Sequence, residues 1–117
     1  MKKIYYLATC STCIRILKEL NDLIDDFQLQ DIKTEKMTPA QVDEMAALAG
    51  SYESLFSRRA MKYKSMGLGN MKLTETDYRN YIVEEYTFLK RPVFIIGEKI
   101  FVGNSAKVVQ AVKEELT

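Results

Sequence analysis

The chain has 117 residues, of which 47% are hydrophobic and 28% charged, and this is the size and composition of one ordinary globular domain. Its formal net charge of +1 gives no general attraction to nucleic acid or to an anionic membrane, and no apolar run approaches the roughly 20 residues that span a bilayer. With two cysteines and no histidine, the chain lacks the ligands for a structural zinc site of its own.

The first third of the chain has the pattern of a strand, a helix and a second strand. Residues 3–7 form a short apolar run, which is typical of a buried strand. Apolar residues then recur at helical spacing over about 11–25, which predicts an amphipathic helix. The expected inward face of this helix consists of Cys13, Ile16, Leu17, Leu20, Leu23 and Ile24. Residues 27–32 alternate apolar and polar, which indicates a half-buried second strand.

The middle of the chain is predicted to be helical. Its clearest helix start is at Thr38, which is followed by Pro39 at the first helical position and by Gln41 where a capping box needs it. Gly50 is expected to end this helix. We expect two short helical pieces within residues 52–67, then a turn at the glycines that follow. A further helix is expected from Thr74 to about residue 90.

The last part of the chain has the pattern of a hairpin and a helix. Arg91-Pro92 interrupts the helical pattern, and residues 93–96 and 99–102 are apolar runs separated by Gly97-Glu98, which predicts a hairpin with a two-residue loop. A final helix follows Ser105. A βαβ unit followed by a ββα unit is the thioredoxin-like topology. We therefore expect an α/β fold with a mixed four-stranded sheet, as a single domain over residues 1–117 with a helical insertion at about 38–90.

Both cysteines lie in the motif Cys10-Ser11-Thr12-Cys13, between the first strand and the first helix. A helix N-terminus has unpaired N–H groups and a partial positive charge, so it favours a thiolate and can lower a cysteine pKa to roughly 3.5–7.5. The alternative is that both cysteines are inert core residues, because a free cysteine packs as a small hydrophobe. The position beside a strand–helix–strand pattern favours a redox motif with Cys10 as the nucleophile.

Several features in combination resemble a known family. They are the Cys10–Cys13 pair, Arg59 ahead of Tyr63 and Gly67-Leu68, the segment Leu89 to Ile96 with its Arg91-Pro92, and Val102-Gly103. Over essentially the whole chain this resembles the arsenate reductase-like family, which includes glutaredoxin-coupled arsenate reductases and Spx-type transcription regulators. The resemblance implies a thioredoxin-like fold with a helical insertion, Cys10 as the nucleophile, and a cis Pro92 beside the cysteine turn. A plain helix stop is the alternative interpretation of Arg91-Pro92.

The arginines bear on arsenate as a substrate. Arsenate-reducing members resemble a pattern of three arginines around the cysteine, and arginine suits an oxyanion because its guanidinium is permanently charged and forked. Arg91 matches the arginine before the proline, and Arg59 matches the one in the insertion, with Arg58 as the fallback. The third falls at Gly103-Asn104 and is missing, which removes a contact typically worth about 1.5–3 kcal/mol.

Two further departures concern the cysteine turn. The arginine that such enzymes carry after the turn falls at Ile14, and Arg15, one position further on, is interpreted as a solvent-facing helix residue. Those enzymes also lack a cysteine at the position of Cys13. Both departures, like the missing arginine, weigh against arsenate as the substrate. The Cys10–Cys13 pair and the Val102-Gly103-Asn104 loop resemble the Spx side of the family.

The chemistry expected from these residues is thiol–disulfide exchange. The Cys10 thiolate attacks an oxidised partner, and Cys13 resolves the mixed disulfide. Arg91 and Arg59 favour the thiolate and hold an anion, together with Ser11 and Thr12 of the turn. No bound cofactor and no metal are expected, and the reductant is glutathione with glutaredoxin, or thioredoxin.

Three classes of function follow. The first is a cytoplasmic thiol-dependent oxidoreductase. The second, implied by the resemblance to Spx, is a redox-sensing transcription regulator that binds the RNA polymerase α subunit. The third is a thioredoxin-fold adaptor without turnover. Direct contact with nucleic acid or with a membrane is expected for none of them.

Overall fold

The computed structural model describes all of residues 1–117 and divides into two compact units, one formed by residues 1–36 with 91–117 and the other by residues 37–90. The elements of the first unit are β1 (Lys2–Tyr6), α1 (Ser11–Leu20), the 3₁₀ helix η1 (Asn21–Ile24), β2 (Gln28–Asp31), β3 (Val93–Ile96), β4 (Lys99–Val102) and α5 (Ala106–Leu116). Those of the second are α2 (Pro39–Ala49), α3 (Met61–Ser65), α4 (Glu75–Glu84) and the 3₁₀ helices η2 (Glu53–Leu55), η3 (Leu68–Asn70) and η4 (Tyr86–Phe88). The single-domain description stays a prediction.

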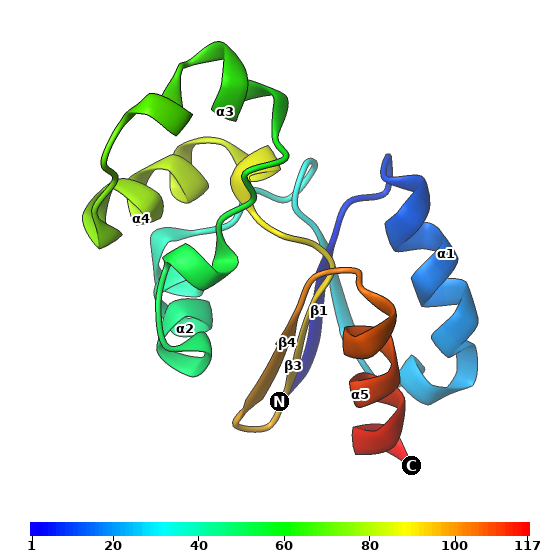
Figure 1. Ribbon diagram of the computed structural model, residues 1–117. Helices are drawn as coiled ribbons and strands as arrows, with labels where there is room; N and C mark the ends of the chain where they lie inside the picture. Colours follow the sequence, from blue (N-terminus) through cyan, green and yellow to red (C-terminus); the bar gives the residue numbers. More distant parts are fainter. The chain divides into compact units, whose positions relative to one another are not determined.

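The sheet of the first unit has the strand order β2-β1-β3-β4. Strands β1 and β2 are parallel, whereas β3 is antiparallel to both β1 and β4. This confirms the predicted mixed four-stranded sheet and the thioredoxin-like fold. Figure 1 shows α1 and α5 on the same side of the sheet. Because β1 feeds directly into α1, the cysteine motif lies where the chain leaves the sheet.

An apolar core fixes α1 and α5 to the sheet. Its buried members are Ile4, Ile16, Leu20, Phe27, Phe94, Val109 and Val112. The inward face predicted for the first helix is confirmed, because Cys13, Ile16 and Leu20 are buried and Leu17 packs against the core from its margin. Burying side chains of this kind stabilises a fold by about 1.5–3 kcal/mol each, so the start of α1 is held firmly in place.

The first helix is shorter than predicted. It ends at Leu20, because Asn21 takes a positive φ of 30° and donates its N–H to the Leu17 carbonyl. Asparagine is one of the non-glycine residues found most often at positive φ. The chain continues as η1, from which Ile24 still packs against the core. The apolar periodicity therefore runs past the end of the helix, and this is why the sequence predicted a helix to residue 25.

The helical starts of the second unit agree with the predictions. Thr38 accepts a hydrogen bond from the Gln41 N–H and completes a capping box, and Gly50 ends α2 with φ +96°. The two short pieces expected within residues 52–67 are η2 and α3. Thr74 caps α4 as predicted, but α4 ends at Glu84, since Glu85 is extended and a separate 3₁₀ turn follows.

Aromatic packing holds the second unit together. The fully buried Phe56 stacks on Phe88 with ring centroids 5.0 Å apart, and it also contacts Tyr78 at 4.9 Å. Two backbone hydrogen bonds join the same segments, from Ser57 N to Phe88 O at 2.7 Å and from Lys90 N to Leu55 O at 2.8 Å. Residues 55–57 and 88–90 therefore form one paired stretch of backbone in this unit.

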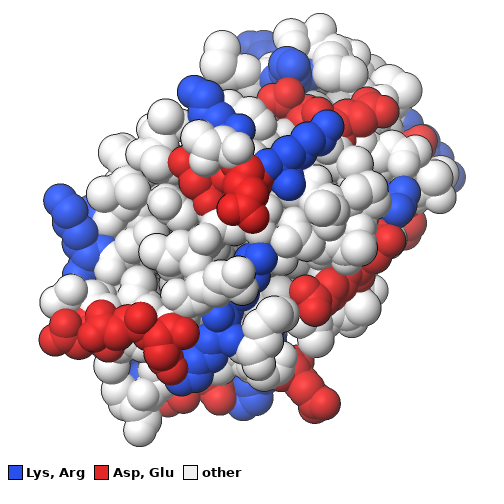
Figure 2. Space-filling model, turned by 180° about the vertical axis from the view of Figure 1, so that it is seen from behind, with Lys and Arg blue, Asp and Glu red and all other residues white.

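The remaining predictions for the C-terminal part are also confirmed. Strands β3 and β4 form the expected hairpin, with Gly97 at φ +63° in its loop, and Ser105 caps α5. None of the helices combines the length and the apolar character that crossing a bilayer requires. Basic and acidic side chains are interspersed on the face in Figure 2.

Candidate active site

The cysteine motif forms a tight turn between β1 and α1. The Cys10 N–H donates to the Leu7 carbonyl at 3.0 Å, and the Cys10 carbonyl accepts the first helical hydrogen bond, from the Ile14 N–H at 3.1 Å. Cys10 is therefore the N-cap residue of α1, with extended backbone angles and a half-buried side chain. Its sulfur therefore faces the first N–H groups of the helix, those of Thr12 and Cys13.

The surroundings of Cys10 lower its pKa. Burial by itself raises the thiol pKa, but the backbone N–H and the thiol of Cys13 stabilise the Cys10 thiolate and act in the opposite direction. The positive charge of Arg91 and the Thr12 backbone N–H lower the pKa of Cys10 further. The net result is a pKa below the ordinary value, without an imidazole, because the chain has no histidine. These are the features of an activated cysteine.

Cys13 has the opposite character. It is fully buried one helical turn after Cys10, and burial is the main reason why its pKa is raised to about 11. The Cys10 thiolate raises the pKa of Cys13 further, whereas a backbone hydrogen bond with Leu7 and the charge of Arg91 lower it. The two thiols are both free in the structure. The pair therefore consists of one sulfur poised as a thiolate and one kept protonated beside it.

Arg91 and Pro92 come from the other end of the first unit, immediately before β3. The Arg91–Pro92 peptide bond is cis, as the resemblance implied, and the Pro92 carbonyl accepts the Gly103 N–H at 2.9 Å. Arg91 lowers the pKa of both cysteines, so its guanidinium lies within electrostatic range of the motif. The structure thus brings Cys10, Cys13 and Arg91 together across about 80 residues of sequence.

The remaining predicted site residues are placed as follows. Ser11 is the exposed first residue of α1, and Thr12 is half-buried with its N–H directed at the Cys10 sulfur. Arg59 is an exposed residue of the second unit. Its expected contribution to the cysteine site stays a prediction.

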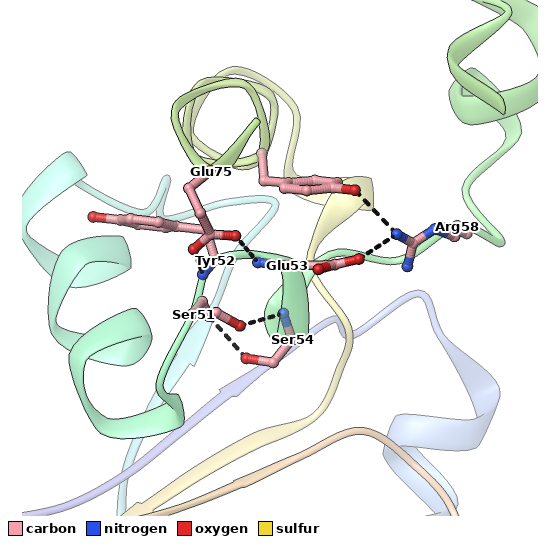
Figure 3. A network of polar contacts seen from close by, with 7 residues as sticks. Ser51, Tyr52, Glu53, Ser54, Arg58 and Glu75 are labelled. Carbon is pink, nitrogen blue, oxygen red and sulfur yellow. Dashed lines mark hydrogen bonds and ion pairs between the residues drawn. The ribbon is translucent and has the colours of Figure 1, made fainter. Parts of the chain in front are cut away.

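Arg58, the fallback for Arg59, is held by its own unit (Figure 3). Its guanidinium donates to the Glu53 carboxylate at 2.8 Å and to the Tyr78 hydroxyl at 3.0 Å. The Glu75 carboxylate accepts the backbone N–H groups of Tyr52 and Glu53, at 2.7 and 3.1 Å, and so fixes the segment that carries Glu53. Arg58 is therefore engaged by two partners within its own unit, and its place as the fallback for Arg59 stays a prediction.

Sequence reasoning missed the surface beside the cysteine turn. Arg15 was expected to be a plain solvent-facing residue, and it is exposed, but it lines a depression together with Thr9, Ser11 and Lys18. The available signal was the spacing of residues 11, 14, 15 and 18, which places them on one face of a helix. No group of three or more His, Cys, Asp or Glu side chains is arranged to hold a metal ion.

The family model described as ArsC family matches residues 5–112 of the chain. The chain belongs to the ArsC family. Among proteins with curated descriptions, none matches it.

Solved structures similar to this ArsC-family chain agree on the fold. The YFFB protein is 17% identical with a TM-score of 0.84, and the match covers 100% of both chains. An arsenate reductase from Vibrio cholerae is 16% identical with a TM-score of 0.78, over 97% of this chain and 95% of the other. An arsenate reductase-related protein from Brucella melitensis is 21% identical with a TM-score of 0.70, over 94% and 92%. At these identities the similarity establishes the fold alone.

Proposed function

We propose that this ArsC-family protein is a thiol–disulfide oxidoreductase in which Cys10 is the nucleophile and Cys13 the resolving residue. The observation that carries the proposal is the asymmetry of the two sulfurs. Cys10 is half-buried with a lowered pKa, and Cys13 is buried with a pKa of about 11. Exchange needs a thiolate to attack first and a second thiol that does not compete with it.

The first step forms a mixed disulfide. The Cys10 thiolate attacks one sulfur of a substrate disulfide, the substrate S–S bond breaks, and one substrate sulfur leaves as a thiolate. Arg91 holds negative charge near the reacting sulfurs. Forming the mixed disulfide removes the charge of the Cys10 thiolate, which is one of the causes that raise the Cys13 pKa. Cys13 therefore becomes easier to deprotonate at the stage where it is needed.

The second step resolves the intermediate. Cys13 gives its proton to the departing substrate thiolate and attacks the Cys10 sulfur, so that the second substrate sulfur leaves. The substrate has gained two electrons, and the protein is left with a Cys10–Cys13 disulfide. A thiol reductant of the glutathione–glutaredoxin or thioredoxin type supplies two electrons and restores both thiols. We place this cycle in the cytoplasm, where such reductants keep cysteines reduced.

Turnover of a small disulfide tests the proposal. With a glutathione or thioredoxin couple, the wild type should turn over bis(2-hydroxyethyl) disulfide, and Cys10→Ser should abolish this activity. Peroxide, a two-electron oxidant, should lower the mass of the wild type by two hydrogen atoms as the disulfide forms, and should not do so in Cys13→Ser. Wild-type protein that shows neither turnover nor an intramolecular disulfide would contradict the proposal. Loss of two hydrogen atoms in Cys13→Ser as well would remove Cys13 from the mechanism.

Arsenate and the RNA polymerase α subunit define the alternatives. Arsenate reduction is supported by Arg91 beside Cys10, but no arginine stands at Gly103-Asn104. An Spx-like regulator needs the Cys10–Cys13 disulfide but no turnover. Assaying arsenate in parallel with the disulfide, and testing the purified polymerase α subunit for binding, separates both alternatives from the proposed activity.

A further inference from the structure

Two adjoining depressions run along α1 in the first unit. The first has a volume of about 490 Å³ and lies beside the cysteine turn, since Thr9 and Ser11, which flank Cys10, both line it. The second has a volume of about 380 Å³, shares Ile14 and Lys18 with the first, and continues to Leu29. Together they form one groove that begins next to the nucleophile and follows the helix away from it.

The far part of the groove is apolar and open. Leu17, Ile24 and Phe27 contribute to its lining. Leu29 is also part of it, is 48% exposed, and lies in β2, the edge strand of the sheet. An edge strand presents backbone N–H and C=O groups that a second extended chain can pair with. Apolar side chains and an open edge favour a polypeptide as the occupant.

The near part of the groove is positively charged. Arg15 and Lys18 are both exposed and form no ion pair, whereas Lys2, Lys99 and Lys113 of the same unit are each paired with a carboxylate. The groove's one carboxylate, Asp25, is at its far part. Two uncompensated cations beside Cys10 attract negative charge on an approaching partner and increase its rate of association.

The length of the groove also favours a polypeptide over a small thiol. The ten residues of α1 rise by about 15 Å, and the groove continues past the end of the helix to Leu29. The part along α1 alone takes about five residues of extended chain. A tripeptide-sized thiol spans only about 10 Å and leaves the Leu29 end empty.

We propose that this groove docks the protein substrate of the exchange reaction, as an extended segment with acidic residues next to its disulfide and apolar side chains beyond them. The proposal rests on the disulfide exchange proposed for Cys10 and adds the chemistry of the partner. The acidic residues contact Arg15 and Lys18, the apolar side chains cover Leu17 and Leu29, and the disulfide reaches Cys10.

Charge reversal tests the near part of the groove. The substrates are a disulfide-bonded peptide with two acidic residues beside its cystine and apolar residues beyond, the same peptide with lysines in place of the acids, and bis(2-hydroxyethyl) disulfide. The double variant Arg15→Glu/Lys18→Glu is compared with Lys36→Glu/Lys107→Glu. This control reverses two exposed charges of the same unit outside the groove. At low ionic strength we expect kcat/KM for the acidic peptide to fall about tenfold in the groove variant only.

The small disulfide separates this proposal from the proposed function. It does not occupy the groove, so dividing kcat/KM for the acidic peptide by kcat/KM for the small disulfide removes any effect of the reversed charges on Cys10 itself. This ratio should fall in the groove variant and stay constant in the control variant. If the wild type turns over the small disulfide but treats the acidic and the lysine peptide alike, the groove proposal is wrong and the exchange activity stands. If kcat/KM for the acidic peptide falls by the same factor in both double variants, the effect comes from net charge alone, and the groove proposal is again wrong.

A binding measurement tests the apolar part without depending on turnover. A fluorescent acidic peptide with serines in place of its cystine is titrated with the wild type, with Leu29→Asp, and with Met71→Asp. Met71 is a matched control, because it is 54% exposed and belongs to the other unit. We expect weaker binding to Leu29→Asp alone. The proposal would be overturned if the peptide did not bind the wild type, or if it bound all three proteins equally. It would also be overturned if glutathione displaced the peptide from the wild type and from Leu29→Asp with the same affinity.

Discussion

Two cysteines separated by two residues have opposite properties in this protein. They differ in burial and in what faces each sulfur. Cys10 is an N-cap residue that faces backbone N–H groups and Arg91, whereas Cys13 lies in the core beneath it. The motif itself could be predicted to be reactive from its place between a strand and a helix. That Arg91 reaches the motif was predicted only from the family resemblance, because local sequence patterns do not give the pairing of β3 with β1.

Arg58 and Arg59 provide a matched pair for the second unit. Arg58→Ala should lower the free energy of unfolding by about 1 kcal/mol or less, because an exposed ion pair contributes little and only one hydrogen bond to Tyr78 is lost with it. Arg59→Ala should leave stability unchanged and slow exchange with an anionic disulfide. Urea unfolding and turnover measured on both variants check this. Equal effects of both variants on turnover would refute the distinction between the two arginines.

The first residues of the helices could be predicted from the sequence more accurately than the last ones. Helix starts were predictable because their signals are local, and Thr38, Thr74 and Ser105 all accept the expected capping hydrogen bond. Helix ends were less predictable. The helices that begin at residues 11 and 75 are each followed by a 3₁₀ turn with an apolar residue that packs inside its unit. These residues are Ile24 and Phe88, so the apolar pattern continues beyond the helix.

The cap of α4 gives a test at the scale of an element. Thr74→Ala removes the acceptor for the Asp77 N–H, and the free energy of unfolding should fall by about 1 kcal/mol. Thr76→Ala is the control, since Thr76 is an exposed residue inside the same helix, where alanine is the better helix former. Thermal or urea unfolding measures both. If the two substitutions have the same effect, the capping box does not stabilise α4.

At the scale of the whole molecule, the order of elements was enough to predict the fold. A parallel βαβ unit and an antiparallel ββα unit share one sheet, and the family match over residues 5–112 agrees. The groove along α1 could not be predicted, because it needs residues of the cysteine turn, α1, η1 and β2 to meet at one surface. Sequence periodicity describes one element at a time.

The stability of the whole protein should depend on pH through both cysteines. Because the folded pKa of Cys10 is lowered, the unfolded state binds the extra proton between that pKa and about 8.5, and stability rises with pH there. Because the folded pKa of Cys13 is raised to about 11, the folded state binds the extra proton between about 8.5 and 11, and stability falls with pH.

Urea unfolding across this pH range, compared between wild type and Cys13→Ala, isolates the contribution of Cys13. The difference in stability between the two proteins should shrink as the pH rises from about 8.5 to 11, because only the wild type has the buried thiol whose unfolded form ionises. A difference that stays constant over this range would mean that the Cys13 pKa is not raised by folding.

The most direct test of the activated cysteine is a titration of the thiolate by its ultraviolet absorbance in Cys13→Ser, where Cys10 is the remaining cysteine. Measured beside Cys13→Ser/Arg91→Gln, the midpoint for Cys10 should lie below the ordinary cysteine value and should rise when the Arg91 charge is removed. A midpoint at the ordinary value of about 8.5, unchanged by Arg91→Gln, would contradict the account.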